Sequence, residues 1–204
     1  MKAIACILLG YVLGSLSPSA LAGKIKKRNL REVGTKNLGA TNTLLTLGKK
    51  WALFVLLFDM AKAFAAVKIA ELLFPGKILL SLLAGLCAIL GHIFPFYMRF
   101  KGGKGLAAFG GMILATDPWR FLFLLVLTTA LMFIVNYSFI MPYGAATLYP
   151  IMTGVLYHSL PAALVCAAAS AVIMIKHRDN LQKARAGADM KIRESAKKIF
   201  GKKK

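Results

Sequence analysis

The sequence has few of the residues that build disulfide frameworks and metal centres. It contains three cysteines and three histidines in 204 residues, and Cys6, Cys87 and Cys166 each lie inside an apolar run. Neither the paired spacing of a zinc site nor a set of regularly spaced cysteines is present. No nucleotide-binding loop and no thiol nucleophile is visible either. We therefore expect the cysteines to be small packing residues, and we expect no metal and no cofactor.

Acidic residues are also scarce. Asp and Glu together number 7, against 27 Lys and Arg, which gives a formal net charge of +20. Such an excess would indicate nucleic acid as a partner if the cations were spread through a soluble chain. Here they are concentrated in a few segments between apolar runs, so we expect no nucleic-acid partner.

Long hydrophobic runs are what the sequence has in abundance. Hydrophobic residues make up 58% of the chain and the mean hydropathy is +0.68, which makes a water-soluble fold improbable. The pattern predicts an all-α polytopic membrane protein with about seven transmembrane helices, forming one domain over residues 1–176 followed by a basic tail, 177–204. The expected spans lie near residues 3–22, 51–74, 78–98, 105–116, 119–136, 142–157 and 160–176.

Two of these spans are unusual. The first could be read as a signal peptide because it begins with a lysine and an apolar run, but it lacks a small-residue cleavage site. The run Gly14-Ser15-Leu16-Ser17-Pro18 instead favours a broken membrane helix. The stretch 105–116 is rich in glycine and too short to cross alone, so we expect one short half-helix surrounded by protein or water.

The distribution of cations predicts the orientation. Residues 23–50 carry eight Lys and Arg, residues 99–104 carry three, and the chain from residue 176 carries eleven. With seven spans these segments share one side of the bilayer with the connection 136–141. Lys and Arg accumulate on the cytoplasmic side, which predicts an outside N-terminus and a cytoplasmic C-terminus in a bacterial inner membrane. The opposite side would hold Lys2, Lys77 and Arg120.

One ionisable pair lies inside an expected span. Asp59 and Lys62 are three residues apart and so share one face of a helix. Charges at that depth usually pair with each other or line a site. Two interpretations are therefore open: a structural ion pair, or a wall of a substrate pocket.

Two basic loops have the composition of a phosphate site. Residues 34–42, Gly-Thr-Lys-Asn-Leu-Gly-Ala-Thr-Asn, and residues 101–105, Lys-Gly-Gly-Lys-Gly, offer unobstructed backbone amides beside cations. Tight turns also need glycine, and basic segments also bind anionic headgroups of membrane lipid without any chemistry. A third polar cluster, His-Arg-Asp-Asn at 177–180, is predicted on the same face. Together the three suit a phosphate-bearing substrate whose remainder is lipid.

The same segments carry a resemblance. Gly14-Ser15, the loop 34–42, the run GHIFPFYMRFKGGKG at 91–105, and His-Arg-Asp-Asn-Leu at 177–181 with Gly187 resemble the motif regions of the PlsY family in order and spacing. That family consists of seven-span bacterial inner-membrane acyltransferases. The resemblance implies transfer of a fatty acyl group from acyl phosphate to the first hydroxyl of glycerol 3-phosphate. Lysophosphatidic acid and phosphate result, by direct attack and without a covalent enzyme intermediate.

The resemblance also implies roles for individual residues. Lys104 would stabilise the departing phosphate, His177 would carry a proton, and Asn180 would complete the polar wall around them. The remaining residues would bind substrate, mainly through phosphate: Thr35, Asn37, Gly39, Thr41, Asn42, Gly102, Gly103, Gly105 and Ser138. Lys36, which stands where the family has a glycine, is a further candidate because it adds a cation.

The chain departs from the family pattern where the acceptor would bind. Leu45 stands where the family usually has an arginine that grips the acceptor phosphate, and Lys36 adds a cation nearby in sequence, although an ammonium does not reproduce a planar fork. In the connection between the fifth and sixth expected spans, Ser138 lies one position before the serine of the family's Tyr-x-Ser pattern. Two alternatives stay open: a relative that acylates another acceptor, and a non-enzymatic membrane protein that binds anionic lipid or conducts an anion.

Overall fold

The chain folds into helices throughout the part that the structure, a computed structural model, describes: residues 1–187 and 191–194. The helices are α1 (Lys2–Ser15), α2 (Pro18–Ile25), α3 (Ala40–Leu47), α4 (Lys49–Leu73), α5 (Ile78–Ile93), the short 3₁₀ helix η1 (Phe96–Met98), α6 (Leu106–Thr116), α7 (Pro118–Val135), α8 (Ile140–Tyr157) and α9 (Leu160–Arg185). The all-α prediction is confirmed for these residues. Residues 188–190 and 195–204 of the predicted basic tail lie outside the described residues.

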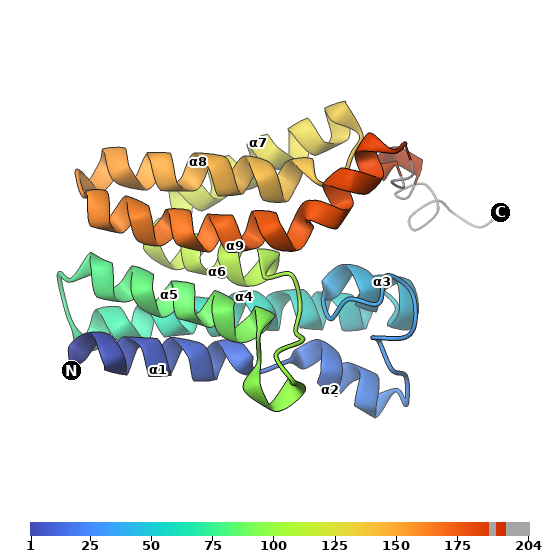
Figure 1. The fold of residues 1–204 in the computed structure, drawn as a ribbon, viewed down its shortest axis with the longest axis horizontal. Coiled ribbons are helices and arrows are strands. Elements are labelled where there is room, and N and C mark those ends of the chain that lie inside the picture. The colour runs from blue at the N-terminus through green and yellow to red at the C-terminus, as the bar shows by residue number, and fades with distance from the viewer. Residues whose placement is uncertain (188–190, 195–204) are drawn as a thin grey trace.

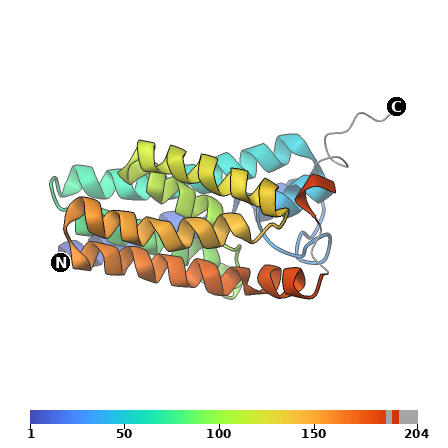
Figure 2. The same ribbon diagram turned by 90° about the horizontal axis from the view of Figure 1, so that it is seen from above.

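The long helices lie side by side in one elongated bundle (Figures 1 and 2). Helix α1 packs against α5 and α4, and α8 packs against α9 and α7. The short α6 contacts α4, α5 and α7, and six of its eleven residues are buried. Its position inside the bundle explains how a helix too short to cross a membrane keeps its apolar residues away from water.

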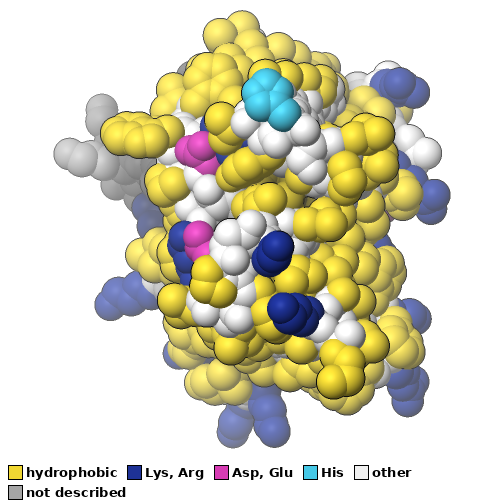
Figure 3. Space-filling view, turned by 90° about the vertical axis from the view of Figure 1, so that its left-hand side faces the viewer, with side chains coloured by type: hydrophobic (Ala, Val, Ile, Leu, Met, Phe, Trp, Pro, Cys, Tyr) yellow, Lys and Arg dark blue, Asp and Glu magenta, His cyan; other side chains and the backbone are white. Residues whose placement is uncertain are grey.

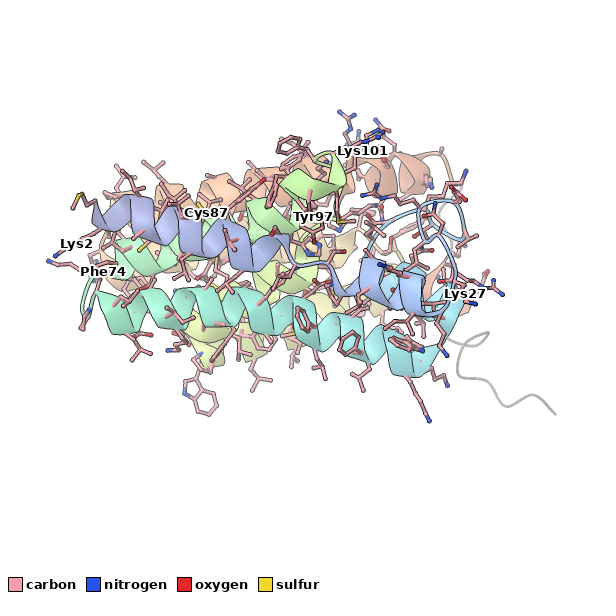
Figure 4. The ribbon with its side chains drawn as sticks, turned by 90° about the horizontal axis from the view of Figure 1, so that it is seen from below. Lys2, Lys27, Phe74, Cys87, Tyr97 and Lys101 are labelled. Atoms are coloured by element: carbon pink, nitrogen blue, oxygen red, sulfur yellow. The ribbon has the colours of Figure 1, made fainter. Side chains whose placement is uncertain are left out.

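Because the long helices alternate in direction, the basic segments meet at one end of the bundle. Residues 16–50, 94–105, 136–139 and 176–187 all lie at the end opposite the N-terminus, which we call the loop end (Figure 1). Lys27 and Lys101 lie toward this end, whereas Lys2 lies over the ring of Phe74 at the other (Figure 4). That other end is covered mainly by hydrophobic side chains, with few charges (Figure 3).

Four stretches of the described chain are long and apolar enough to cross a membrane: Lys2–Ile25, Ile78–Met98, Pro118–Val135 and Leu160–Arg185. The expected break in the first is present, since α1 ends at Ser15 and α2 begins at Pro18. Ser17 caps α2 by accepting a hydrogen bond from the amide of Ala20 at 3.3 Å. Helix α9 continues without interruption past residue 177, so the third polar cluster lies on its last turns.

Glycine allows α1 and α5 to pack with their backbones in close contact. A Cβ built on Gly10 or Gly14 of α1 would collide with the carbonyl oxygen of Ala84 or Ala88 on α5. A Cβ on Gly91 of α5 would in turn collide with the carbonyl oxygen of Tyr11. Small residues at a helix interface are the usual means of close approach in membrane proteins. The two helices are further joined where Tyr97, following α5, donates to the carbonyl of Ser15 at 2.8 Å (Figure 4).

We predict that Gly14→Ala destabilises the detergent-solubilised protein by about 1–3 kcal/mol, because the added methyl must push α1 away from α5. Gly110→Ala is the matched control, since its Cβ would make only ordinary contacts, the nearest at 3.4 Å from Phe121. The control should be neutral or more stable by up to about 1 kcal/mol, as expected from helix propensity. Thermal unfolding of both variants measures the difference, and equal melting temperatures would contradict the close packing.

Candidate active site

The second glycine-rich loop folds back onto the end of α5. The amide of Gly102 donates to the carbonyl of Ile93 at 2.9 Å, and the amide of Gly103 donates to the carbonyl of His92 at 3.2 Å. These bonds satisfy carbonyls at the end of α5 that have no partner within the helix. A Cβ on either glycine would collide with an atom of His92. Both amides, which the sequence suggested as phosphate donors, are therefore used to hold the loop in place.

The start of α6 offers other donors. Gly105 is its N-cap, with φ of +86°, a left-handed conformation that favours glycine. The amides of the first turn of α6 have no acceptor within the helix, and the helix dipole places partial positive charge there. Helix N-termini of this kind bind phosphate readily. Lys104 precedes this turn directly and adds a full positive charge.

Lys104 is joined to residues from two distant segments. Its Nζ donates to Oδ1 of Asn180 on α9, and Nδ2 of Asn180 donates to Oγ of Ser138 at 3.1 Å. Ser138 lies in the connection between α7 and α8. The structure thus brings together three of the predicted site residues in one hydrogen-bonded chain beside the start of α6. We call Lys104, Asn180 and Ser138 the polar chain.

His177 lies three residues before Asn180 on the same helix, and its side chain is buried. Its Nδ1 lies 2.9 Å from the carbonyl oxygen of Ile173. A carbonyl only accepts hydrogen bonds, so Nδ1 must carry a proton and donate it. In the neutral imidazole Nε2 then has the free lone pair, and this nitrogen can accept a proton.

The first glycine-rich loop is shaped by Asn42, which is fully buried. Its Oδ1 accepts from the amide of Thr35 at 2.7 Å, and its Nδ2 donates to the carbonyl of Leu30 at 2.7 Å. Gly34 has φ of +61°, and a Cβ there would collide with Oδ1 of Asn42. Both the oxygen and the nitrogen of this side chain are hydrogen-bonded to backbone, so Asn42 holds the loop from the interior of the protein.

The other predicted residues of this loop lie nearer its surface. Thr35, Lys36 and Thr41 are exposed, and Asn37 and Gly39 are half-buried. Lys36 has a left-handed backbone with φ of +58°. Their placement at the loop end leaves their polar groups accessible from outside the bundle.

Sequence reasoning missed two connections behind the loops. Arg31 Nη2 donates to the carbonyls of Lys101 and, at 3.4 Å, Met98, which ties the first loop to the second. Asp59 and Lys62 form an ion pair at 2.7 Å, one of the two arrangements that the sequence left open, with both side chains 2% exposed, and His92 joins them at 3.1 Å from Asp59. The spacing of Asp59 and Lys62 indicated the pair, but nothing in the sequence connected it to His92.

We predict that Asn42→Ala destabilises the protein by about 1–3 kcal/mol, because it removes the partner of the Thr35 amide and of the buried Leu30 carbonyl and leaves a small cavity at a fully buried position. Thr41→Ala, one residue earlier and exposed, is the control and should change stability by less than about 0.5 kcal/mol. Thermal unfolding in detergent compares the two. A stable Asn42→Ala protein would show that the loop does not depend on this amide.

Residues 4–187 match the family described as glycerol-3-phosphate acyltransferase. A glycerol-3-phosphate acyltransferase of Coxiella burnetii is 36% identical over 197 residues, covering 95% of this chain and 100% of the relative. Another, from Exiguobacterium sibiricum, is 37% identical over 201 residues, covering 97% of each chain. This chain is therefore similar to these relatives over almost its whole length.

The fold is also similar to that of a solved protein, the integral membrane glycerol 3-phosphate acyltransferase PlsY (YgiH). Its glycerol 3-phosphate form superimposes with a TM-score of 0.90 at 27% identity, covering 99% of this chain and 100% of that one. Its lysophosphatidic acid form gives a TM-score of 0.85 over 94% of this chain and 95% of that one. With sequence and fold in agreement over nearly the full length, this chain is a multi-pass integral membrane protein that belongs to the glycerol-3-phosphate acyltransferase family.

Proposed function

We propose that this acyltransferase takes a fatty acyl group from acyl phosphate and transfers it to the first hydroxyl of glycerol 3-phosphate. The products are lysophosphatidic acid and inorganic phosphate. The observation that carries the proposal is the polar chain beside the N-terminus of α6, where Lys104 meets Asn180 and, through it, Ser138. A cation, two uncharged polar groups and helix amides converge there, which suits a phosphate that gains charge as it leaves.

The reaction needs no covalent intermediate on the protein. The acceptor hydroxyl oxygen attacks the acyl carbonyl carbon, a new C–O ester bond forms, and the bond between that carbon and the phosphate oxygen breaks. Catalysis then rests on holding the two substrates in line and on neutralising the departing phosphate. Lys104 supplies the positive charge, and Asn180 positions the lysine through its Oδ1.

His177 is our candidate for the hydroxyl proton. The bond from its Nδ1 to the carbonyl of Ile173 fixes the ring and leaves the Nε2 lone pair for that proton. The proton then passes to the released phosphate, so that the histidine returns to its neutral form. Among the residues that the structure describes, no hydrogen bond or ion pair joins an acidic side chain to the ring. The carbonyl of Ile173 is therefore the group that orients it.

The first loop is our candidate for the acceptor phosphate. Thr35, Lys36, Asn37 and Thr41 would contribute a hydroxyl, an ammonium, an amide and a second hydroxyl. Asn42 and Gly39 would shape the loop: Asn42 through its bonds to Thr35 and Leu30, and Gly39 through its carbonyl, which accepts from Thr43 Oγ1 at 3.0 Å. Gly102, Gly103 and Gly105 would act in the same way in the second loop, by allowing its close return onto α5.

We propose an orientation in which the loop end faces the cytoplasm of a bacterium, with seven spans in the inner membrane, an outside N-terminus and the chain from residue 177 inside. The cations of residues 23–50 and 99–104 support this, since they collect at the loop end. In this orientation both soluble species, glycerol 3-phosphate and inorganic phosphate, meet the site from the cytoplasm. The acyl chain lies against the apolar surface of the bundle, among membrane lipid.

A second candidate function is acylation of a different phosphate-bearing or hydroxyl-bearing acceptor. The observation that favours it is Leu45, a residue of α3 that is 45% exposed. An exposed leucine at the loop end offers no charge to an acceptor phosphate, where the resembling family has an arginine. The donor half of the site, with Lys104, is unaffected by this difference.

We predict that the purified protein in detergent releases phosphate from palmitoyl phosphate only when glycerol 3-phosphate is present. Lys104→Ala should lower that rate by about 10²–10³-fold, the usual cost of removing one group that stabilises developing negative charge. Lys101→Ala is the matched control, because it removes an exposed lysine of the same loop and should keep the wild-type rate. Release that never depends on glycerol 3-phosphate would exclude this acceptor, and other acceptors would then be tried.

We further predict that Leu45→Arg lowers the KM for glycerol 3-phosphate by about tenfold, because one added charge-assisted hydrogen bond contributes about 1.5 kcal/mol. Leu45→Met, of similar volume and without charge, is the control and should leave the KM unchanged. Steady-state phosphate release at varied glycerol 3-phosphate measures both. An unchanged KM for the arginine variant would indicate that the acceptor phosphate binds away from α3.

A further inference from the structure

Three ionisable side chains lie behind the glycine-rich loops, and the proposed reaction uses none of them. Asp59 and Lys62 are on α4 and His92 is on α5. All three side chains are buried, at 2%, 2% and 8% exposure. Ionisable groups inside a membrane protein are costly and usually serve a function. Their position directly behind the second loop suggests what that function is.

The contacts of Lys62 account for all three of its protons. Its Nζ lies 2.6 Å from the carbonyl of Leu16, 2.7 Å from Oδ1 of Asp59 and 2.9 Å from Nδ1 of His92. An ammonium has three donors and no acceptor, so each neighbour accepts one hydrogen bond. With Lys62 as the donor, Nδ1 of His92 accepts and the ring proton resides on Nε2. Nδ1 also lies 3.1 Å from Oδ1 of Asp59, but in this tautomer it has no proton to donate to the carboxylate.

The Nε2 side of His92 faces the junction of the two glycine-rich loops. A Cβ built on Gly103 would collide both with Nε2 of His92 and with the carbonyl oxygen of Leu38. Leu38 belongs to the first loop and Gly103 to the second. Gly103 is therefore the point where the imidazole ring contacts both loops. They can approach so closely because Gly103 has no side chain. The backbone of His92 also accepts the amide of Gly103 at 3.2 Å.

We propose that Asp59, Lys62 and His92 form a positioning cluster that holds the two glycine-rich loops against each other. Asp59 holds the ammonium of Lys62, the ammonium orients the imidazole through Nδ1, and the Nε2 edge of the ring sets the separation of Leu38 from Gly103. Because Lys104 follows Gly103 directly, the cluster fixes the lysine of the polar chain without touching substrate. The kinetic consequence rests on the proposed function, whereas the placement of the loops does not.

Two substitutions test the roles of Nδ1 and Nε2 separately. His92→Asn keeps an acceptor where Nδ1 stands but has nothing at the Nε2 position. His92→Gln can place an amide nitrogen at the Nε2 position but leaves Lys62 without its third acceptor. A cluster that only stabilises the bundle would make the asparagine variant the better enzyme. A cluster that positions the loops makes the glutamine variant the better enzyme, even though it is the less stable of the two.

We therefore expect crossed effects. His92→Asn should melt close to the wild-type temperature but show kcat lowered by about 10²-fold, the usual cost of a displacement of about 1 Å in a catalytic group. His92→Gln should melt at a lower temperature yet keep kcat within about tenfold of wild type. Tyr149→Phe is the control: it removes a buried hydroxyl bonded to Thr116 at 2.8 Å, near the far end of α6. It should lower the melting temperature and leave kcat and KM unchanged.

Hydrogen exchange of the peptide covering residues 100–106 measures the loops independently of activity. The amides of Gly102 and Gly103 should exchange at least about tenfold faster in His92→Asn than in wild type and at the wild-type rate in Tyr149→Phe. If neither His92 variant folds, Asp59→Asn, which keeps the side-chain shape, should show the same faster exchange. Activity that follows melting temperature across the His92 variants, or unchanged exchange in all variants, would overturn the proposal. A wild-type protein without phosphate release would refute the proposed function, and the exchange data would still decide this inference.

Discussion

The structure depends on how a lysine ammonium is accommodated in an apolar bundle. The side chain of Lys62 is 2% exposed and is shielded from water, so the protein must supply every hydrogen bond. It does so from three segments: the carbonyl of Leu16 at the break between α1 and α2, the carboxylate of Asp59, and the imidazole of His92 on α5. Satisfying one charge thus fixes the relative positions of α1, α4 and α5.

That constraint extends to the loops. The end of α5 is held by the lysine through His92, and its last carbonyls accept the amides of Gly102 and Gly103. The chain can return so closely only because these residues lack a side chain. The return places Lys104 and the start of α6 against Asn180 on α9. The contacts thus run without a break from the bundle interior to the proposed phosphate site. They begin at the buried ion cluster, pass through the glycine-rich loop and end at the N-terminus of α6.

The glycines therefore act differently from what their sequence suggests. A Gly-Gly pair beside lysines is typical of a loop whose amides bind phosphate, and the run at 101–105 fits that description. In the structure the two central amides are bonded to α5, and the amides without an acceptor in their own helix are those of the first turn of α6. Asn42 shows the same shift, because its Oδ1 accepts from Thr35 in the loop and its Nδ2 donates to Leu30 before it. In both loops glycine or asparagine fixes the backbone, and Lys104 and Asn180 are hydrogen-bonded to each other beside the start of α6.

Sequence alone determined the features that depend on local pattern. Apolar runs predicted the all-helical class, Gly14 to Pro18 predicted the break in the first span, and the glycine-rich stretch 105–116 predicted a short helix, which α6 is. The motif runs pointed to the acyltransferase family, which the family match confirms, and the spacing of Asp59 and Lys62 placed both on one helical face, where they pair.

Only the tertiary structure decided which distant residues meet. Nothing local connects Ser138 to Asn180, or His92 to Lys62, because these contacts join separate helices whose packing depends on the whole bundle. It also decided which polar groups remain for a ligand and which are spent inside the protein. That distinction depends on hydrogen-bond partners many residues away in the sequence. A buried carbonyl or ammonium can bond to a donor or acceptor that, from the motif alone, would be expected to bind substrate.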